Sequence, residues 1–133
     1  MKALKILAVV VVAYAGIVAA FESLIGFFQP RDESNLLITT FDADGTPHDR
    51  ILSSLESEGR LYVAANHWPR AWYDRALENP DVQATRGGER GDYRAVPVTG
   101  AEHDRVESEH SLGPVLRFLT GFPPRLFLRL DPR

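Results

Sequence analysis

Hydrophobic residues are distributed unevenly along this chain, and the longest apolar run lies near the N-terminus. Residues 6–21 carry no charge, and apolar sequence continues to Phe28 with Glu22 as the one charged interruption. A helix needs about 20 mostly apolar residues to cross a bilayer, and residues 3–28 meet that length. We predict that residues 1–28 form a membrane anchor or signal-anchor helix. A cleaved signal peptide and a soluble packed helix are the alternatives.

Charges on the two flanks of this run bear on its orientation. Lys2 and Lys5 precede the run, whereas the downstream flank of Arg31, Asp32 and Glu33 is not enriched in basic residues. The positive-inside rule then favours a cytoplasmic N-terminus, with the following domain outside the cytoplasm.

Beyond a polar linker at residues 29–34, the pattern changes to short apolar or alternating runs separated by turn residues. Such runs are typical of β-strands, whose side chains point to opposite faces in turn. A helical pattern follows the third run, and two more precede the last run. The predicted strands are residues 36–41, 48–55, 60–65, 82–86, 93–99 and 125–130, and the predicted helices are residues 69–78, 99–110 and 114–120.

Turn and capping signals support these boundaries. Residues 42–45 (Asp-Ala-Asp-Gly) are a hairpin turn signal between the first two strands. Residues 87–91 are rich in glycine and predict a second hairpin loop. Thr99 and Glu102 have the spacing of a capping box that opens a helix.

The order of the strands predicts the fold class. Six short strands in mostly meander order, with one helix after the third, favour a small antiparallel barrel. A parallel doubly wound sheet would need a helix between nearly every pair of strands. We therefore expect a mainly β protein with short helices (α+β), in which residues 35–133 form a six-stranded antiparallel barrel preceded by the N-terminal hydrophobic helix.

Composition and charge narrow the classes of function. The chain has no cysteine, which excludes disulfides, thiolate metal ligands and thiol nucleophiles. Its net charge of −3 argues against non-specific nucleic-acid binding. His103, Glu107 and His110 share one face of a predicted helix, but the charged residues around them are typical of a solvated helix. We therefore assign no metal ligands.

The most informative segment for function lies where the third strand meets the following helix. Asn66, His67, Trp68, Arg70 and Trp72 occupy this junction. Arginines and free N–H groups at the start of a helix attract anions, and flat aromatic rings pack against a flat ligand. The segment therefore suits an anionic aromatic ligand, such as a flavin-type cofactor. Packing of the two tryptophans in the core is the competing interpretation.

Two basic residues on the second strand extend this candidate site. His48 and Arg50 lie on either side of Asp49. If the strand lines a cleft, Arg50 can hold a phosphate through a bidentate contact. A solvated strand face, or an ion pair with a nearby acid, is the alternative.

Several short motifs recur in order between residues 36 and 98. They are Leu-Ile-Thr-Thr at 37–40, Gly-Thr-Pro at 45–47, Leu-Tyr-Val-Ala at 61–64, and a helix that opens with Pro69 to Trp72 and ends at Asn79 and Pro80. In these residues the chain resembles the deazaflavin (F-420)-dependent nitroreductase and quinone reductase family. That family has the split β-barrel fold of FMN-binding, pyridoxamine-phosphate-oxidase-like proteins.

The resemblance implies an oxidoreductase that uses reduced deazaflavin, coenzyme F-420, to reduce a quinone or nitro-type acceptor, with FMN as the alternative cofactor. It implies that the cofactor's phosphate tail is held by the second strand and by the loop after the third strand. It also implies membrane association through residues 3–28, and split barrels often pair as homodimers. The implied cofactor-binding residues are His48, Arg50, Asn66, His67, Trp68, Arg70 and Trp72.

One departure from the family pattern keeps a second function open. The family usually has a basic turn after the first strand, whereas this chain has two aspartates at residues 42–45. A carboxylate repels a phosphate. The alternative is a non-catalytic or flavin- or haem-binding split-barrel module tethered to the membrane. A domain outside the cytoplasm would also not meet a cytosolic reduced deazaflavin, so the side of the membrane stays open.

Overall fold

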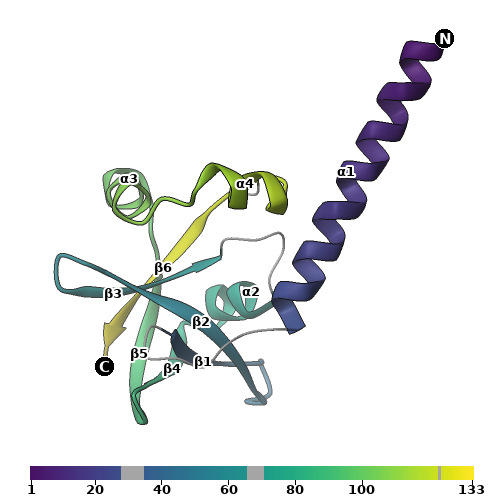
Figure 1. Cartoon of the computed structure of the whole chain (residues 1–133). Helices are drawn as coiled ribbons and strands as arrows, with labels where there is room; N and C mark the ends of the chain where they lie inside the picture. The colour runs from purple at the N-terminus through teal and green to yellow at the C-terminus, as the bar shows by residue number, and fades with distance from the viewer. Residues whose placement is uncertain (28–34, 66–70, 123) are drawn as a thin grey trace. The chain divides into compact units, whose positions relative to one another are not determined.

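The computed structural model describes residues 1–27, 35–65, 71–122 and 124–133, and the predicted fold class is confirmed (Figure 1). In the described chain, six antiparallel strands close into a barrel, and four helices accompany them. The predicted linker at residues 29–34 lies outside the described residues. The strands are β1 (Asn35–Phe41), β2 (Pro47–Ser57), β3 (Arg60–Ala65), β4 (Asp81–Arg86), β5 (Glu89–Pro97) and β6 (Leu126–Pro132), and the helices are α1 (Lys2–Phe27), α2 (Ala71–Glu78), α3 (Gly100–Glu109) and α4 (Pro114–Thr120).

Two compact units make up the chain: α1 with α4, and the barrel with α2 and α3. The strand order around the barrel is β1-β2-β3-β6-β5-β4, and β1 closes the ring by pairing with β4. Closure leaves no exposed edge among the described strands, and such an edge would otherwise be free to pair with another chain. The β3–β6 pair joins segments that are far apart in sequence, so hydrophobic alternation on each strand does not predict it.

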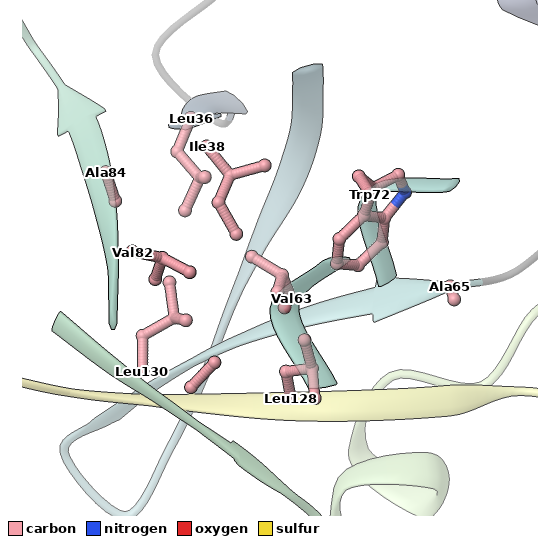
Figure 2. Packing of buried hydrophobic residues seen from close by; sticks show 11 residues of the cluster. Leu36, Ile38, Val63, Ala65, Trp72, Val82, Ala84, Leu128 and Leu130 are labelled. Atoms are coloured by element: carbon pink, nitrogen blue, oxygen red, sulfur yellow. The ribbon is translucent and has the colours of Figure 1, made fainter. Parts of the chain in front are cut away.

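The inner face of the barrel carries the main core (Figure 2). Alternate positions on β3 and β6 point inward, and Val63, Leu128 and Leu130 are buried there as their spacing predicts. Leu126 is 41% exposed at the start of β6, although it shares that alternation. The buried cluster is Leu36, Ile38, Val63, Ala65, Trp72, Ala76, Val82, Ala84, Ala95, Leu128 and Leu130.

A second, smaller core lies on the outer face of the barrel beneath α3. Tyr62 and Phe127 point outward from β3 and β6, and both are fully buried with Val106 of α3 and Val98. This cluster explains why β6 has apolar residues on both faces: its inner face packs in the barrel, and α3 covers its outer face.

The helix α3 begins where the Thr99–Glu102 capping box predicts, but the hydrogen bonds of the predicted capping box do not form. Thr99 is the N-cap residue, but its side chain makes no capping hydrogen bond. Glu102 instead accepts hydrogen bonds from Arg129 and Tyr62. A carboxylate gains more from a charged guanidinium than from a backbone N–H, so the tertiary partner displaces the local one.

In the other unit, α1 has the length and composition of a membrane-crossing helix over Lys2–Leu24, and no residue of its most apolar window is buried. The same properties are found in signal sequences. The hydroxyl of Tyr14 donates to the carbonyl oxygen of Phe118 in α4 at 2.8 Å, and the two rings lie 5.0 Å apart.

Candidate functional site

The β1–β2 hairpin carries polar residues on its inner face, next to the apolar core of the barrel. Thr40 pairs with His48, and Ile38 pairs with Arg50. Directly opposed residues of an antiparallel pair point to the same face, and so do alternate residues along each strand. Ile38 is fully buried in the inner core. Thr40, His48 and Arg50 therefore lie on the inner face, where the core gives way to polar side chains.

Arg75 of α2 joins these residues, and sequence reasoning did not find it. Its Nε donates to the hydroxyl of Thr40 at 3.1 Å. The Thr40 hydroxyl in turn donates to the carbonyl oxygen of His48 at 3.5 Å. Within the described chain, the two terminal nitrogens of Arg75 make no hydrogen bond or ion pair. We call Thr40, His48, Arg50 and Arg75 the hairpin site.

The only signal for Arg75 in the sequence is its place next to Ala76 on a short helix. Trp72 and Ala76 mark the buried face of α2, and both belong to the inner core. Arg75 lies beside that face, and it is directed to β1 by the packing of α2 against β1 and β5. That packing is tertiary, and no local pattern shows it.

The acidic turn that separates this chain from the family pattern is tied into the hairpin. Asp42 Oδ2 lies 2.7 Å from Nε2 of His48, and Asp44 accepts the N–H of Thr46 at 3.1 Å. Hydrogen bonds from the side chain and backbone of Thr46 lower the pKa of Asp44. Gly45 closes the turn at φ +85°, a conformation that favours glycine. Both carboxylates therefore have a structural role, but they still place negative charge near the hairpin site.

Trp72, the described tryptophan of the predicted site, is 3% exposed and packs in the inner core (Figure 2). Its ring meets that of Tyr73 edge-on, with 5.9 Å between centroids. Core packing was the competing interpretation for this residue, and it describes the side chain here. A contact of Trp72 with a cofactor stays a prediction.

The remaining predicted site residues lie in a segment that the structure does not describe. They are Asn66, His67, Trp68 and Arg70, and their predicted role stays a prediction. Of the predicted set, the structure thus places His48 and Arg50 on one strand face, adds Arg75 to them, and leaves Trp72 in the core beneath α2.

A second polar cluster, which sequence reasoning also missed, lies on the outer face under α3. The hydroxyl of Tyr62 donates to Glu102 at 3.0 Å and accepts from Nη2 of Arg105 at 3.2 Å. Burial, and then the hydrogen bond to Glu102, raise the pKa of Tyr62. Its phenol is fully buried in this network. Tyr62 therefore holds α3 to β3 and is not positioned to donate a proton to a ligand at the hairpin site.

The histidines and the glutamate of the predicted α3 face point to different partners. His103 Nε2 lies 2.9 Å from the carbonyl oxygen of Arg125, and His110 Nε2 lies 2.8 Å from that of Glu56. Glu107 lies 3.3 Å from Nη1 of Arg125. Among the described residues, no group of three or more histidines or carboxylates has the geometry of a metal site.

Comparisons with known proteins bear on the fold. No protein-family model and no curated protein sequence matches this chain. A solved F420-H2 dependent reductase, FDR-A, shares 21% sequence identity with a TM-score of 0.61, over 78% of this chain and 99% of that one. The haem storage protein HutZ from Vibrio cholerae shares 18% identity with a TM-score of 0.58, over 77% of this chain and 83% of that one.

A third protein of the same architecture comes from Listeria innocua and is assigned as a pyridoxamine 5′-phosphate oxidase. It shares 13% identity with a TM-score of 0.54, over 91% of this chain and 94% of that one. At these identities the likeness establishes the fold, a split β-barrel. One fold supports many functions, so function has to be argued from the site.

Proposed function

We propose that this chain is a membrane-associated oxidoreductase that binds reduced deazaflavin, coenzyme F-420, and reduces a quinone or nitro-type acceptor. The observation that supports this function is the position of Arg75. Thr40 holds one edge of its guanidinium at 3.1 Å, and no described residue binds the other edge. A guanidinium fork that is already oriented suits bidentate recognition of a phosphate. Among proteins of the same fold is an F420-H2 dependent reductase.

The charges of the described residues fit an anionic group at this position. Arg75 and Arg50 supply permanent positive charge on one face of the hairpin. His48 is hydrogen-bonded to Asp42, so it orients the turn more directly than it serves a ligand. The cofactor, when bound, supplies the hydride chemistry, and the protein supplies binding and orientation. We assign no catalytic residue.

The acidic turn favours the alternative function in one respect, which is the size of the anionic cofactor. Asp42 and Asp44 disfavour a long polyanionic tail at the hairpin, because like charges repel at close range. A smaller anionic cofactor, FMN or haem, in a membrane-tethered module without reductase activity is therefore the second candidate. A haem storage protein has the same fold.

A titration of the full chain in lipid nanodiscs separates these candidates. Fluorescence quenching of coenzyme F-420 and FMN, and the absorption band of haem, report binding of each group. Reduction of a soluble quinone by the chain loaded with reduced F-420 then reports activity. F-420 binding with quinone reduction supports the first function. Binding of FMN or haem alone supports the second, and no binding by folded protein contradicts both.

A matched pair of variants tests the position of the site. Arg75→Gln removes the fork, and Arg94→Gln removes an exposed arginine on β5. A hydrogen bond to a charged group contributes about 1.5–3 kcal/mol, so Arg75→Gln should weaken binding by about tenfold or more. Arg94→Gln should bind like the unmodified chain. Equal affinity of the two variants would place the phosphate elsewhere.

The proposal also requires the barrel to lie on the cytoplasmic side, where reduced deazaflavin is made available. The basic flank of α1 favours the opposite orientation. Protease treatment of sealed, right-side-out membrane vesicles tests this point. A protected barrel is expected, and complete digestion from outside would contradict the first function.

A further inference from the structure

Helix α4 has an apolar surface that is unusually exposed for so short an element. Val115, Phe118 and the following Phe122 are 71%, 50% and 62% exposed. The one charged residue of the helix is Arg117. A group of large exposed apolar side chains marks a surface that binds a protein, a ligand or a membrane. The element that α4 contacts indicates which of these three the surface binds.

That element is the midsection of α1. The hydroxyl of Tyr14 donates to the carbonyl oxygen of Phe118 at 2.8 Å. Tyr14 precedes Glu22 by about two helical turns, which is about 12 Å along the axis. If Glu22 lies at headgroup level, the contact with α4 lies inside a hydrocarbon layer about 30 Å thick. The exposed apolar surface of α4 is thus continuous with the apolar surface of the anchor helix.

At the C-terminal end of α4, backbone carbonyls have hydrogen-bond partners within the protein, as an apolar environment requires. In hydrocarbon, polar backbone groups have to find partners within the protein. The carbonyl of Arg117 accepts the N–H of Phe122 at 3.0 Å, and that of Leu116 accepts the hydroxyl of Thr120 at 2.9 Å. The carbonyl of Phe118 accepts the N–H of Gly121 at 3.3 Å in addition to Tyr14. Two of the four carbonyls that a helix end leaves without intrahelical partners, those of Arg117 and Phe118, are therefore bonded within the protein.

The N-terminal end and the single charge of α4 are compatible with a position in the same layer. Pro114 occupies the first turn and has no N–H to satisfy. Arg117 is exposed, and an arginine can extend its charged head to the headgroups while its stem lies among apolar groups.

We propose that α4 and Phe122 insert into the hydrocarbon layer of a lipid bilayer beside α1. The proposal rests on the membrane association of α1 and adds a second lipid contact to it. Because α4 lies between α3 and β6 in the sequence, the barrel domain would then be linked to the bilayer at two points in the chain rather than one.

The absence of native cysteine allows a direct test with single labels. Val115→Cys in α4, Val10→Cys in α1 and Glu89→Cys in the barrel each receive an environment-sensitive fluorophore. The full chain is reconstituted into phosphatidylcholine vesicles, with and without lipids that carry a spin label in the acyl chain. We expect the labels at Val115 and Val10 to shift to shorter wavelength and to be quenched by the spin-labelled lipid, and the label at Glu89 to do neither. Phe122→Cys, as an independent variant, should behave like Val115→Cys.

The outcomes are distinguishable. If the label at Val10 is quenched but the labels at Val115 and Phe122, like that at Glu89, neither shift nor are quenched, the insertion of α4 is overturned. The membrane association of α1 then still stands. No quenching at Val10 would overturn both the insertion and the membrane association. Coenzyme F-420 binding by the same labelled proteins is read separately, so a failure of the cofactor proposal leaves this inference unaffected.

Discussion

Arg129 on β6 and Glu102 on α3 form an ion pair, in which Nη1 of the arginine donates to both carboxylate oxygens, each at 3.0 Å. The glutamate side chain is 22% exposed and also accepts the hydroxyl of Tyr62. The pair links a helix to the outer face of the barrel. It also explains why Glu102 does not cap its own helix.

Loss of this pair should lower stability in a pH-dependent way. Burial alone would raise the pKa of Glu102, but hydrogen bonds from Arg129 and Tyr62 outweigh it and lower the pKa below its usual value of 4.5. A carboxylate with a lowered pKa in the folded state stabilises the protein above its unfolded pKa, and the contribution is lost as pH falls through the folded pKa. Glu102→Gln should therefore lower the free energy of unfolding by about 1–3 kcal/mol at pH 7.

Urea unfolding of the unmodified chain and of Glu102→Gln at several pH values measures this difference. The gap between them should shrink below pH 4.5, the usual pKa of the carboxyl. Glu89→Gln, at an exposed position of the β4–β5 hairpin, is the control and should behave like the unmodified chain. A gap for Glu102→Gln that is constant from neutral to acidic pH would show that the charge of the pair does not matter.

Two neighbouring threonines offer a matched test of the hairpin site. Both are buried in β1, but Thr40 holds Arg75 on the inner face, whereas Thr39 donates to Asp49 on the outer face at 2.6 Å. Thr39→Val removes the hydrogen bond to Asp49, and Thr40→Val removes those to Arg75 and to the carbonyl oxygen of His48. Each lost bond costs about 1 kcal/mol of stability. Only Thr40→Val should also weaken cofactor binding, because it releases the guanidinium of Arg75.

Unfolding curves and F-420 or FMN titrations of Thr39→Val and Thr40→Val measure the two effects separately. Parallel losses of affinity in both variants would mean that general hairpin stability, and not the orientation of Arg75, governs binding.

The acidic turn should limit affinity for an anionic ligand. Asp42→Asn removes one negative charge next to His48 and leaves an amide that can still hydrogen-bond to the ring. A unit charge a few Å away contributes about 1 kcal/mol in water, so affinity for F-420 should rise about fivefold. The effect should fall with added salt, because exposed charges are screened. Titrations at low and high ionic strength check this, and a loss of affinity in Asp42→Asn would show that the carboxylate takes part in binding.

The Tyr14 hydroxyl should hold α4 against α1. Tyr14→Phe keeps the ring contact of 5.0 Å and removes the 2.8 Å hydrogen bond to Phe118. The carbonyl of Phe118 keeps the N–H of Gly121, so the substitution removes one hydrogen bond between α1 and α4, which contributes about 1 kcal/mol. With the fluorophore at Val115, we expect Tyr14→Phe to move the emission to longer wavelength in vesicles. Unchanged emission would show that the hydroxyl does not position α4.

Local sequence patterns determined much of this protein's secondary structure. Period-two alternation on residues 60–65 and 125–130 predicted their strands, and the Asp-Ala-Asp-Gly turn predicted the first hairpin. The uncharged N-terminal run predicted a long apolar helix. These features depend on neighbours within a few residues, because side-chain direction and turn conformation follow directly from the backbone. The number and order of the strands, with one helix after the third, then predicted a closed antiparallel barrel.

The tertiary structure decided which polar side chains meet. The pairing of β3 with β6 set α3 over an outward Tyr62 and Phe127, and the pairing of Glu102 with Arg129 replaced a local cap. Because Trp72 packs in the core, α2 is oriented so that Arg75 contacts Thr40. A residue's partner across the barrel is set by strand register and helix packing over long sequence separations. No local pattern contains that information, which is why the hairpin site could be predicted only in part.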